Sequence, residues 1–262
     1  MNMIDFYKYQ GTGNDFVIID NRDNHFDGCN TETVRFLCDR RFGVGGDGLM
    51  LLENHAEYDF TMRYFNSDGN EASMCGNGGR CIAAFAVHLN IVPAKETFQF
   101  MAVDGLHEAK YDDGIVSLKM IDVKNVDAND DYTFLDTGSP HFVQFHESVE
   151  NLNINKMGSE VRYSDTFMPG GTNANFVHFI NDNTIKVRTY ERGVENETLA
   201  CGTGVVASAI SAHLKKKDIN EFNVDVLGGK LKVSFEPNAD GGFNNIWLVG
   251  PATFVFKGTI EV

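Results

Sequence analysis

Two stretches, Cys75-Gly76-Asn77-Gly78 and Cys201-Gly202-Thr203-Gly204, are copies of one motif. Each leads from a strand-like run into an apolar, Ala-rich segment with the pattern of a helix, at about residues 77–89 and 203–216. Because only two copies occur, they indicate two related domains rather than a solenoid. The motif therefore predicts a duplicated fold.

Two further pairs of segments support the duplication. Met62-Arg63-Tyr64-Phe65-Asn66 resembles Val187-Arg188-Thr189-Tyr190-Glu191. Gly11-Thr12 with Phe16-Val17 matches Gly171-Thr172 with Phe176-Val177 at the same internal spacing. Both pairs precede the Cys-Gly motif of their own half, as a repeat requires.

Strand-like runs rich in Val, Ile, Phe and Tyr outnumber helical patterns. We expect an α+β fold with two pseudo-symmetric domains. Each would be a curved, mostly antiparallel sheet wrapped around a central helix, with the active site in the interdomain cleft. A further helix is predicted at 31–41. The predicted strands are 6–9, 16–19, 60–65, 98–103, 106–111, 115–120, 174–180, 184–190, 223–227 and 230–235.

We place the first domain at residues 1–117 and the second at 118–250. The linker is placed between about residues 115 and 130, where the stretch 122–131 is acidic and polar. Residues 251–262 are apolar and strand-like, and they are expected to join the first domain as an added strand.

Composition excludes several classes of protein. With 22 Lys and Arg against 37 Asp and Glu in 262 residues, the net charge of −15 would repel a phosphate backbone, so nucleic-acid binding is excluded. The sequence shows neither a signal peptide nor an apolar run of the ~20 residues that cross a bilayer. Five cysteines, an odd number, favour reduced thiols. We expect a cytoplasmic protein without membrane contact.

A cysteine at a helix N-terminus lies beside unpaired N–H groups and the positive end of the helix dipole, which stabilise a thiolate. The glycines of each motif let the backbone N–H groups hold a carboxylate. Two such thiols on opposite faces of one carbon could invert its configuration, since one removes the α-proton and the other returns a proton. This chemistry needs neither a metal nor an organic cofactor.

The alternative for any intracellular cysteine is a small buried hydrophobe. The second copy of the motif argues against that interpretation for Cys75 and Cys201. For Cys29, Cys38 and Cys81 it stands, and the spacing of Cys75 and Cys81 matches no common zinc motif.

The chain resembles the diaminopimelate epimerase family along essentially its whole length. The resemblance implies a cofactor-independent enzyme that interconverts LL- and meso-diaminopimelate with two cysteines, for lysine and peptidoglycan synthesis. The ordered landmarks are Gly13-Asn14-Asp15-Phe16, Arg41-Phe42-Gly43 with Asp47-Gly48, Asn66-Ser67-Asp68-Gly69, Met74 to Gly78, Ser139-Pro140-His141, Gly171-Thr172-Asn173, Glu191-Arg192-Gly193 and Glu197 to Gly204.

By position, the resemblance implies that Cys75 and Cys201 are the acid/base pair, and that His141 and Glu191 tune the thiols. The implied substrate-binding residues are Asn14, Asn66, Gly76, Asn77, Ser139, Asn173, Glu191, Arg192, Gly202 and Thr203. Arg192 would bind the distal carboxylate. The expected partner is a small-molecule substrate, and a homodimer is left open.

Each assignment has a simpler alternative. The asparagines could only cap turns, His141 could be a satisfied core histidine, and Glu191 with Arg192 could be an exposed ion pair. Two other functions also stay open. One is a racemase for proline or hydroxyproline, which would leave the polar groups for a second amino-acid head unpaired. The other is a redox or anion-binding protein in which Cys75 and Cys201 form a regulatory disulfide.

Overall fold

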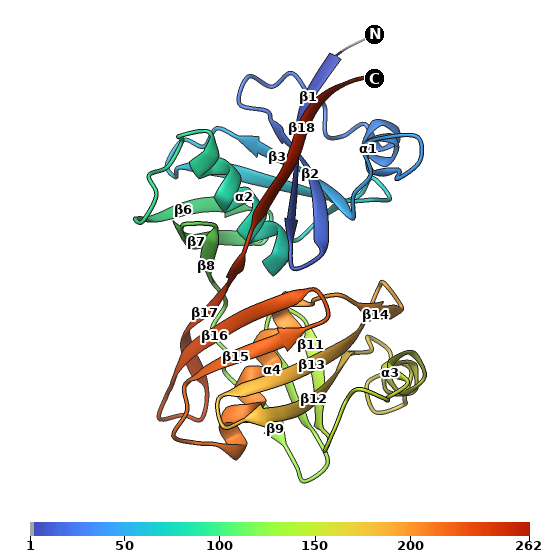
Figure 1. Cartoon of the computed structure of the whole chain (residues 1–262), viewed down its shortest axis with the longest axis vertical. Helices are drawn as coiled ribbons and strands as arrows, with labels where there is room; N and C mark the ends of the chain where they lie inside the picture. The colour runs from blue at the N-terminus through green and yellow to red at the C-terminus, as the bar shows by residue number, and fades with distance from the viewer. Residues whose placement is uncertain (1–2) are drawn as a thin grey trace. The chain divides into compact units, whose positions relative to one another are not determined.

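The computed structural model describes residues 3–262 and divides into two units (Figure 1). Unit 1 extends to Leu118 and also contains the C-terminal segment Gly250–Val262, while unit 2 is Lys119–Val249. The boundaries predicted after residues 117 and 250 lie within one residue of these positions.

Unit 1 is a curved sheet with strand order β18-β1-β2-β3-β4-β6-β7-β8, and the short β5 also pairs with β4. The β2–β3 and β4–β6 pairs are parallel and the others antiparallel. Its elements are β1 (Met3–Gly11), β2 (Asn14–Asp20), α1 (Thr31–Cys38), β3 (Gly48–Glu53), β4 (Phe60–Asn66), β5 (Glu71–Ala72), α2 (Gly76–His88), β6 (Thr97–Ala102), β7 (Gly105–Asp112), β8 (Ile115–Lys119) and β18 (Thr253–Glu261).

Unit 2 repeats this topology as β9-β10-β11-β12-β13-β15-β16-β17, with β14 on β13 and parallel pairs at β11–β12 and β13–β15. The predicted α+β class and internal duplication are confirmed. Its elements are β9 (Val126–Ala128), β10 (Thr133–Asp136), β11 (Pro140–Phe145), α3 (Ile154–Arg162), β12 (Asn173–Asn181), β13 (Thr184–Glu191), β14 (Asn196–Thr198), α4 (Gly202–Lys215), β15 (Glu221–Val226), β16 (Gly229–Pro237) and β17 (Phe243–Pro251).

The topology corrects one part of the predicted repeat. Met62–Asn66 and Val187–Glu191 do occupy matching strands, β4 and β13. However, Gly11-Thr12 precedes β2, whereas Gly171-Thr172 precedes β12, whose counterpart is β3, so that pairing was wrong. The true counterpart of Thr12-Gly13 is Thr137-Gly138, which precedes β11, and both glycines have positive φ, 87° and 110°.

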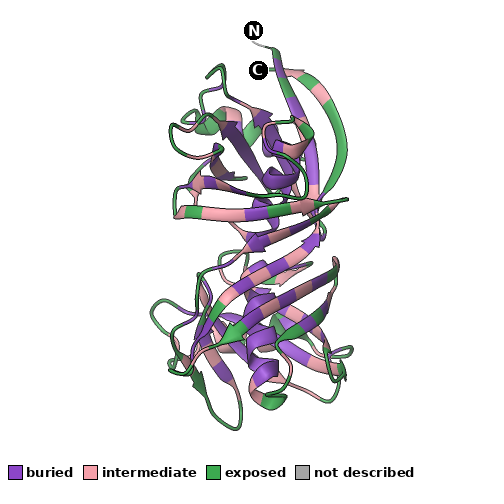
Figure 2. Ribbon diagram, turned by 90° about the vertical axis from the view of Figure 1, so that its left-hand side faces the viewer, coloured by how far each residue is buried: buried purple, intermediate pink, exposed green. Residues whose placement is uncertain are grey.

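Each unit is built around a central helix of small and apolar side chains. In α2 every residue from Gly76 to Ala86 is buried, and α4 is buried at nearly all positions up to His213. Figure 2 shows these helices largely in the buried colour. Such close packing allows little freedom at the helix start. The sheet therefore fixes the position of the cysteine that precedes each helix.

The acidic stretch predicted as the linker is part of the sheet of unit 2. Val123 exchanges two backbone hydrogen bonds with Phe243, of 2.7 and 2.9 Å, and β9 pairs with β10. Its polar side chains are mostly exposed, which explains the linker-like composition. The predicted linker range, about residues 115–130, includes the boundary after Leu118, but its acidic part belongs to unit 2.

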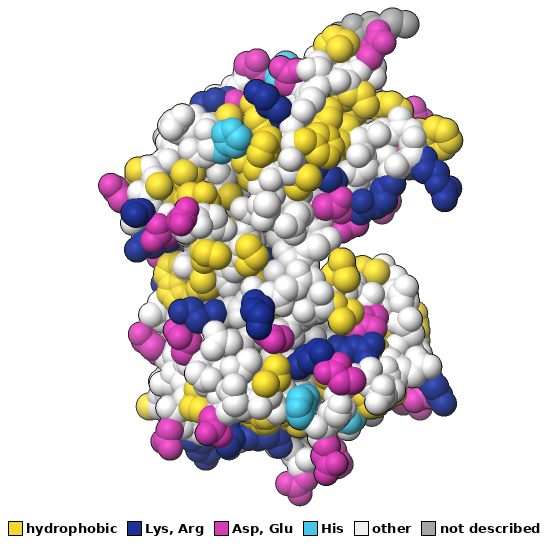
Figure 3. Space-filling model, viewed as in Figure 1, with side chains coloured by type: hydrophobic (Ala, Val, Ile, Leu, Met, Phe, Trp, Pro, Cys, Tyr) yellow, Lys and Arg dark blue, Asp and Glu magenta, His cyan; other side chains and the backbone are white. Residues whose placement is uncertain are grey.

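Basic and acidic side chains are intermingled on the face drawn in Figure 3. None of the helices in residues 3–262 has the length and hydrophobicity of a membrane-spanning segment.

Candidate active site

Both cysteines of the repeated motif occupy the N-cap of a central helix. Cys75 precedes α2 with φ −101° and ψ 148°, and Cys201 precedes α4 with φ −114° and ψ 110°. At α2 the cysteine sulfur accepts a hydrogen bond from the backbone of the first turn, whereas the Cys201 side chain makes no such cap hydrogen bond to α4.

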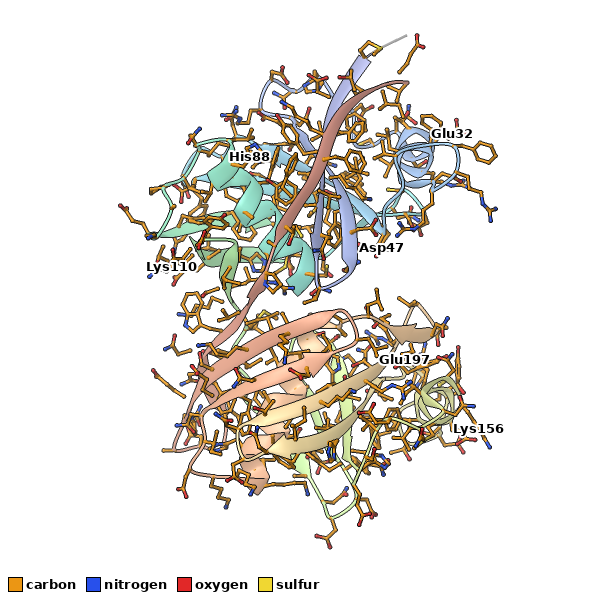
Figure 4. All side chains as sticks on the ribbon, in the orientation of Figure 1. Glu32, Asp47, His88, Lys110, Lys156 and Glu197 are labelled. Carbon is orange, nitrogen blue, oxygen red and sulfur yellow. The ribbon has the colours of Figure 1, made fainter. Side chains whose placement is uncertain are left out.

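The approach to each helix is held by the same ion pair. Arg63 on β4 forms a two-point ion pair with Glu71 on β5, with Nε–Oε1 and Nη2–Oε2 distances of 2.7 and 3.2 Å. Arg188 on β13 pairs in the same way with Glu197 on β14 (labelled in Figure 4), with Nε–Oε1 and Nη2–Oε2 distances of 2.6 and 2.8 Å. Two-point contacts of this kind fix orientation as well as distance. They restrain the hairpin that leads into each cysteine.

The Cys75 half-site consists of Cys75, Asn14, Gly76 and Asn77. The Gly78 N–H donates to Cys75 Sγ at 3.2 Å, and the Cys75 thiol donates to Asn14 Oδ1 at 4.0 Å. A backbone donor stabilises a thiolate more than a thiol. The helix start therefore favours a base at this position.

Asn14 is held in place by contacts to both of its amide atoms. Its Nδ2 donates to Asp47 Oδ2 at 2.6 Å, and its Oδ1 accepts from Asn77 Nδ2 at 3.2 Å. Asp47, labelled in Figure 4, directly precedes β3 and also accepts from Arg40 at 2.7 Å. The Asn14 side chain thus belongs to a network rather than to a local turn cap.

Asn66 is the exposed last residue of β4, opposite Gly48 of β3, and its carbonyl accepts from the Gly69 N–H at 2.9 Å. Gly48 in turn lies opposite Phe16 of β2. Since β2 and β3 begin where β4 ends, Asn14 and Asn66 lie at one edge of the sheet.

The Cys201 half-site consists of Cys201, Gly202, Thr203, His141 and Ser139. Cys201 Sγ lies 3.5 Å from Thr203 Oγ1, which lies 2.8 Å from His141 Nε2. Ser139 Oγ is 3.0 Å from the same imidazole nitrogen and 3.3 Å from Thr203 Oγ1. The imidazole thus reaches the sulfur through the threonine hydroxyl.

The tautomer of His141 follows from Asn175 on β12. Asn175 Nδ2 donates to Phe142 O at 2.8 Å, a contact that only the amide nitrogen can make, and the same nitrogen donates to His141 Nδ1 at 3.1 Å. The proton of the ring is then on Nε2, which points to Thr203. Burial, together with the charge of Arg192, lowers the pKa of His141 to about 3. The imidazole is therefore neutral at physiological pH.

The predicted thiol-tuning role of His141 remains a proposal, acting on Cys201 through Thr203. Asn175, which orients the imidazole, was not predicted. The available signal was an asparagine in the middle of an otherwise apolar strand, where a buried amide needs polar partners.

Replacing His141 with asparagine is expected to flatten the pH dependence of stability. The folded pKa of His141, about 3, lies below its ordinary value of 6.5, so stability from this group is present above pH 6.5 and is lost as pH falls toward 3. Over the acidic part of that range, the free energy of unfolding of the wild type should fall more steeply than that of the variant, by up to about 1.4 kcal/mol per pH unit. Urea unfolding followed by circular dichroism measures both slopes. Equal slopes would contradict the assignment of a buried neutral imidazole.

Two further predicted residues, Asn173 and Arg192, are linked to the Cys201 half-site, and Glu191 precedes Arg192 in the chain. Asn173, the first residue of β12, donates to Ser139 Oγ at 3.2 Å and to Pro140 O at 3.0 Å, and accepts from the Arg192 N–H at 2.8 Å. The Arg192 guanidinium donates to Gly170 O at 3.1 Å. Glu191 ends β13 at the same edge, and its carbonyl accepts from the Glu195 N–H at 2.8 Å.

The other cysteines have different surroundings. Burial raises the pKa of Cys38 and of Cys81 to about 12, so both remain protonated, and Cys29 is exposed. In the described residues 3–262, no three His, Cys, Asp or Glu side chains are arranged to hold a metal ion.

Solved structures of low sequence identity share this fold. A phenazine biosynthesis protein of the PhzF family from Bacillus anthracis superposes with a TM-score of 0.79 at 12% identity, over 100% of both chains. A probable proline racemase from Agrobacterium radiobacter does so with a TM-score of 0.68 at 15% identity, over 99% of this chain and 92% of the other. These similarities establish the fold.

Sequence comparison establishes the family. The family profile described as Diaminopimelate epimerase matches residues 6–120 and 133–255. The diaminopimelate epimerase of Flavobacterium psychrophilum is 52% identical over 256 residues, covering 97% of this chain and 99% of the relative. Fold, helix-capping cysteines and relatives together define an amino-acid epimerase. The chain belongs to the diaminopimelate epimerase family.

Proposed function

We propose that this protein interconverts LL- and meso-2,6-diaminopimelate without a cofactor, using Cys75 and Cys201 as a two-base pair. The observation that carries the proposal is the duplicated N-cap cysteine, one at each central helix. Membership of the family supports the substrate.

The reaction consists of two proton transfers at one α-carbon. One cysteine, as thiolate, removes the α-proton, and the C–H electron pair remains on carbon. The other cysteine, as thiol, gives its proton to the opposite face, which inverts the centre. The thiols have then exchanged protonation states and reset by proton exchange with water. Inversion therefore needs one thiol on each face of the carbon.

The carbanion is stabilised by fixed hydrogen-bond donors. The N–H groups of Gly76, Asn77, Gly202 and Thr203 start helices whose dipoles favour an anion, and they hold the reacting carboxylate. These donors are already in place before the reaction, so little reorganisation accompanies the negative charge.

The second amino-acid head of diaminopimelate needs polar partners that proline would leave unused. We assign its carboxylate to the Arg192 guanidinium and its ammonium group to Glu191. Asn14, Asn66, Ser139 and Asn173 complete the binding site, with their amide and hydroxyl groups at the sheet edges described above.

We also propose a cytoplasmic enzyme that forms a homodimer through β18. This strand pairs with β1 and exposes 40% of Phe254, 51% of Val255 and 43% of Phe256. Hydrophobic side chains gather over this strand in Figure 3. An exposed apolar surface of this kind suits a second copy of the chain. Sedimentation equilibrium should give twice the mass of one chain, and a Val255→Lys variant should give the single-chain mass. A single-chain mass for the wild type would contradict the dimer.

The substrate is tested by incubating the reduced protein with LL-diaminopimelate, L-proline or trans-4-hydroxy-L-proline and separating stereoisomers by chiral chromatography. We expect only diaminopimelate to be epimerised. Turnover of proline with none of diaminopimelate would point to the racemase alternative. Activity that appears only after oxidation and reduction cycles would point to the redox alternative.

A further inference from the structure

Arg80 is a buried cation that the sequence analysis did not assign to the site. It lies one turn into α2 and is 0% exposed, the largest of the fully buried side chains. Arginine is almost never fully buried unless its charge is paired. Its surroundings therefore need an explanation.

All hydrogen-bond acceptors of the Arg80 guanidinium are neutral. Nη1 donates to Gly76 O at 3.0 Å, and Nη2 donates to Asn77 Oδ1 at 3.1 Å and to Thr12 Oγ1 at 3.2 Å. Nε donates to Pro251 O at 3.4 Å. Within residues 3–262 no carboxylate forms an ion pair with this group. Its donors are satisfied, while its charge is left without a counterion.

The titratable groups that interact with this charge are two cysteines. Burial lowers the pKa of Arg80, and the charges of Cys81 and Cys75 oppose that effect. Burial also raises the pKa of Cys81 to about 12, so Cys81 is neutral. Cys75 is therefore the group that can supply the missing negative charge.

Arg80 also determines which way two amides point. A guanidinium only donates, so the Asn77 atom that faces it is Oδ1, and Asn77 Nδ2 faces Asn14 Oδ1 at 3.2 Å. Asn14 Nδ2 then meets the acceptor Asp47 at 2.6 Å. A cation at one end and a carboxylate at the other fix both amides in one orientation.

The helix of unit 2 lacks this cation. Arg80 follows Cys75 by five residues. The residue that follows Cys201 by the same interval is Val206 of α4, which is 0% exposed. The imidazole near Cys201, that of His141, is neutral. The two thiols are therefore in electrostatically different surroundings, although the backbone around them is repeated.

The other charged groups near the Cys75 half-site do not supply this charge. The cations Lys8 and Arg40 are each paired with Asp15, at 2.7 and 2.6 Å, and Arg40 also with Asp47. On the far side, Asp104 accepts from the Met74 N–H at 3.4 Å and pairs with His107. Carboxylates so placed disfavour a thiolate.

We propose that Arg80 is a positioning residue of the Cys75 half-site, which fixes the Asn77 and Asn14 amides and supplies the positive charge beside Cys75. Its effect on turnover rests on the proposed function, whereas its effect on the thiol does not. This positive charge favours the thiolate form of Cys75.

The test is the pH dependence of alkylation by iodoacetamide, followed separately at Cys75 and Cys201 by peptide mass spectrometry. The rate follows the thiolate fraction. In Arg80→Met the midpoint for Cys75 should rise by about one pH unit, which makes alkylation about tenfold slower below the midpoint. Cys201 in the same sample should keep its midpoint. Arg35→Met, which removes an exposed arginine from α1, controls for net charge and should leave both midpoints unchanged.

Arg80→Lys keeps the positive charge but loses the planar guanidinium that binds both amides. The Cys75 midpoint should therefore shift less than in Arg80→Met, while turnover should still fall. An unshifted Cys75 midpoint in folded Arg80→Met would overturn the proposal. If circular dichroism shows that Arg80→Met does not fold, the Arg80→Lys variant becomes the test. A wild-type Cys75 midpoint together with wild-type turnover in Arg80→Lys would then overturn the proposal. A wild type that does not epimerise diaminopimelate would contradict the proposed function, but the alkylation result would still decide the role of Arg80.

Discussion

Replacing either Cys75 or Cys201 with serine is expected to lower epimerisation of diaminopimelate by at least about 10³-fold, since a positioned acid/base group contributes about 10² to 10⁴. A serine hydroxyl has nearly the same shape as the thiol but neither loses nor gives a proton readily at neutral pH. The fold should therefore persist, with an unchanged circular dichroism spectrum. Steady-state turnover measured in both directions gives the loss.

Cys29→Ser is the matched control for these two substitutions. Cys29 is exposed, and its replacement should leave turnover at the wild-type level. The two-cysteine mechanism is contradicted if either active-site variant keeps a tenth or more of the wild-type rate.

Replacing Gly204 with alanine is expected to disrupt the Cys201 half-site by displacing the Asn175 side chain, which supports His141. The added Cβ would lie 2.4 Å from Asn175 Oδ1 and 3.3 Å from His141 Cε1. Asn175 cannot move freely, because it also donates to Phe142 O at 2.8 Å. Overpacking of this kind costs about 1–3 kcal/mol. A displaced half-site should also lose about 10²-fold in turnover.

Gly170→Ala is the control for this substitution, since nothing lies within 4 Å of a Cβ added there. Denaturant unfolding and turnover of both variants separate the steric effect from the loss of a glycine. Wild-type stability and turnover in Gly204→Ala would show that the contact with Asn175 does not hold the half-site.

The central helices could be predicted from the sequence because their signals are local. The segments predicted at 77–89 and 203–216 lie within one residue of Gly76–His88 and Gly202–Lys215. A cysteine cap, a glycine pair and an Ala-rich run together identify a buried helix start.

Helix α3 was not predicted, because its stability comes from tertiary contacts. Its sequence is mostly polar and has Gly158 in the interior, which disfavours an isolated helix. A Cβ at Gly158 would lie 2.2 Å from Tyr190 Cβ, so glycine is needed for the helix to approach β13. Only the folded sheet reveals that requirement.

The site residues were predictable where a motif carries them and unpredictable where packing does. Asn14, His141 and Asn173 came from the family resemblance, and the structure places each within a hydrogen-bonded network of its own unit. Arg80 and Asn175 support those networks from within a helix and a strand. A single polar residue in an apolar element gave too little signal for a role.

The most direct test of the two-cysteine mechanism is epimerisation of LL-diaminopimelate in deuterated water, followed by NMR at low conversion. Removal by one thiol and return by another predict meso product with one deuterium at the inverted centre, and recovered LL substrate that is still unlabelled. Deuterium that appears in the recovered LL substrate as fast as in the product would indicate a single base. So would meso product that retains the original proton, and either result would contradict the two-cysteine mechanism.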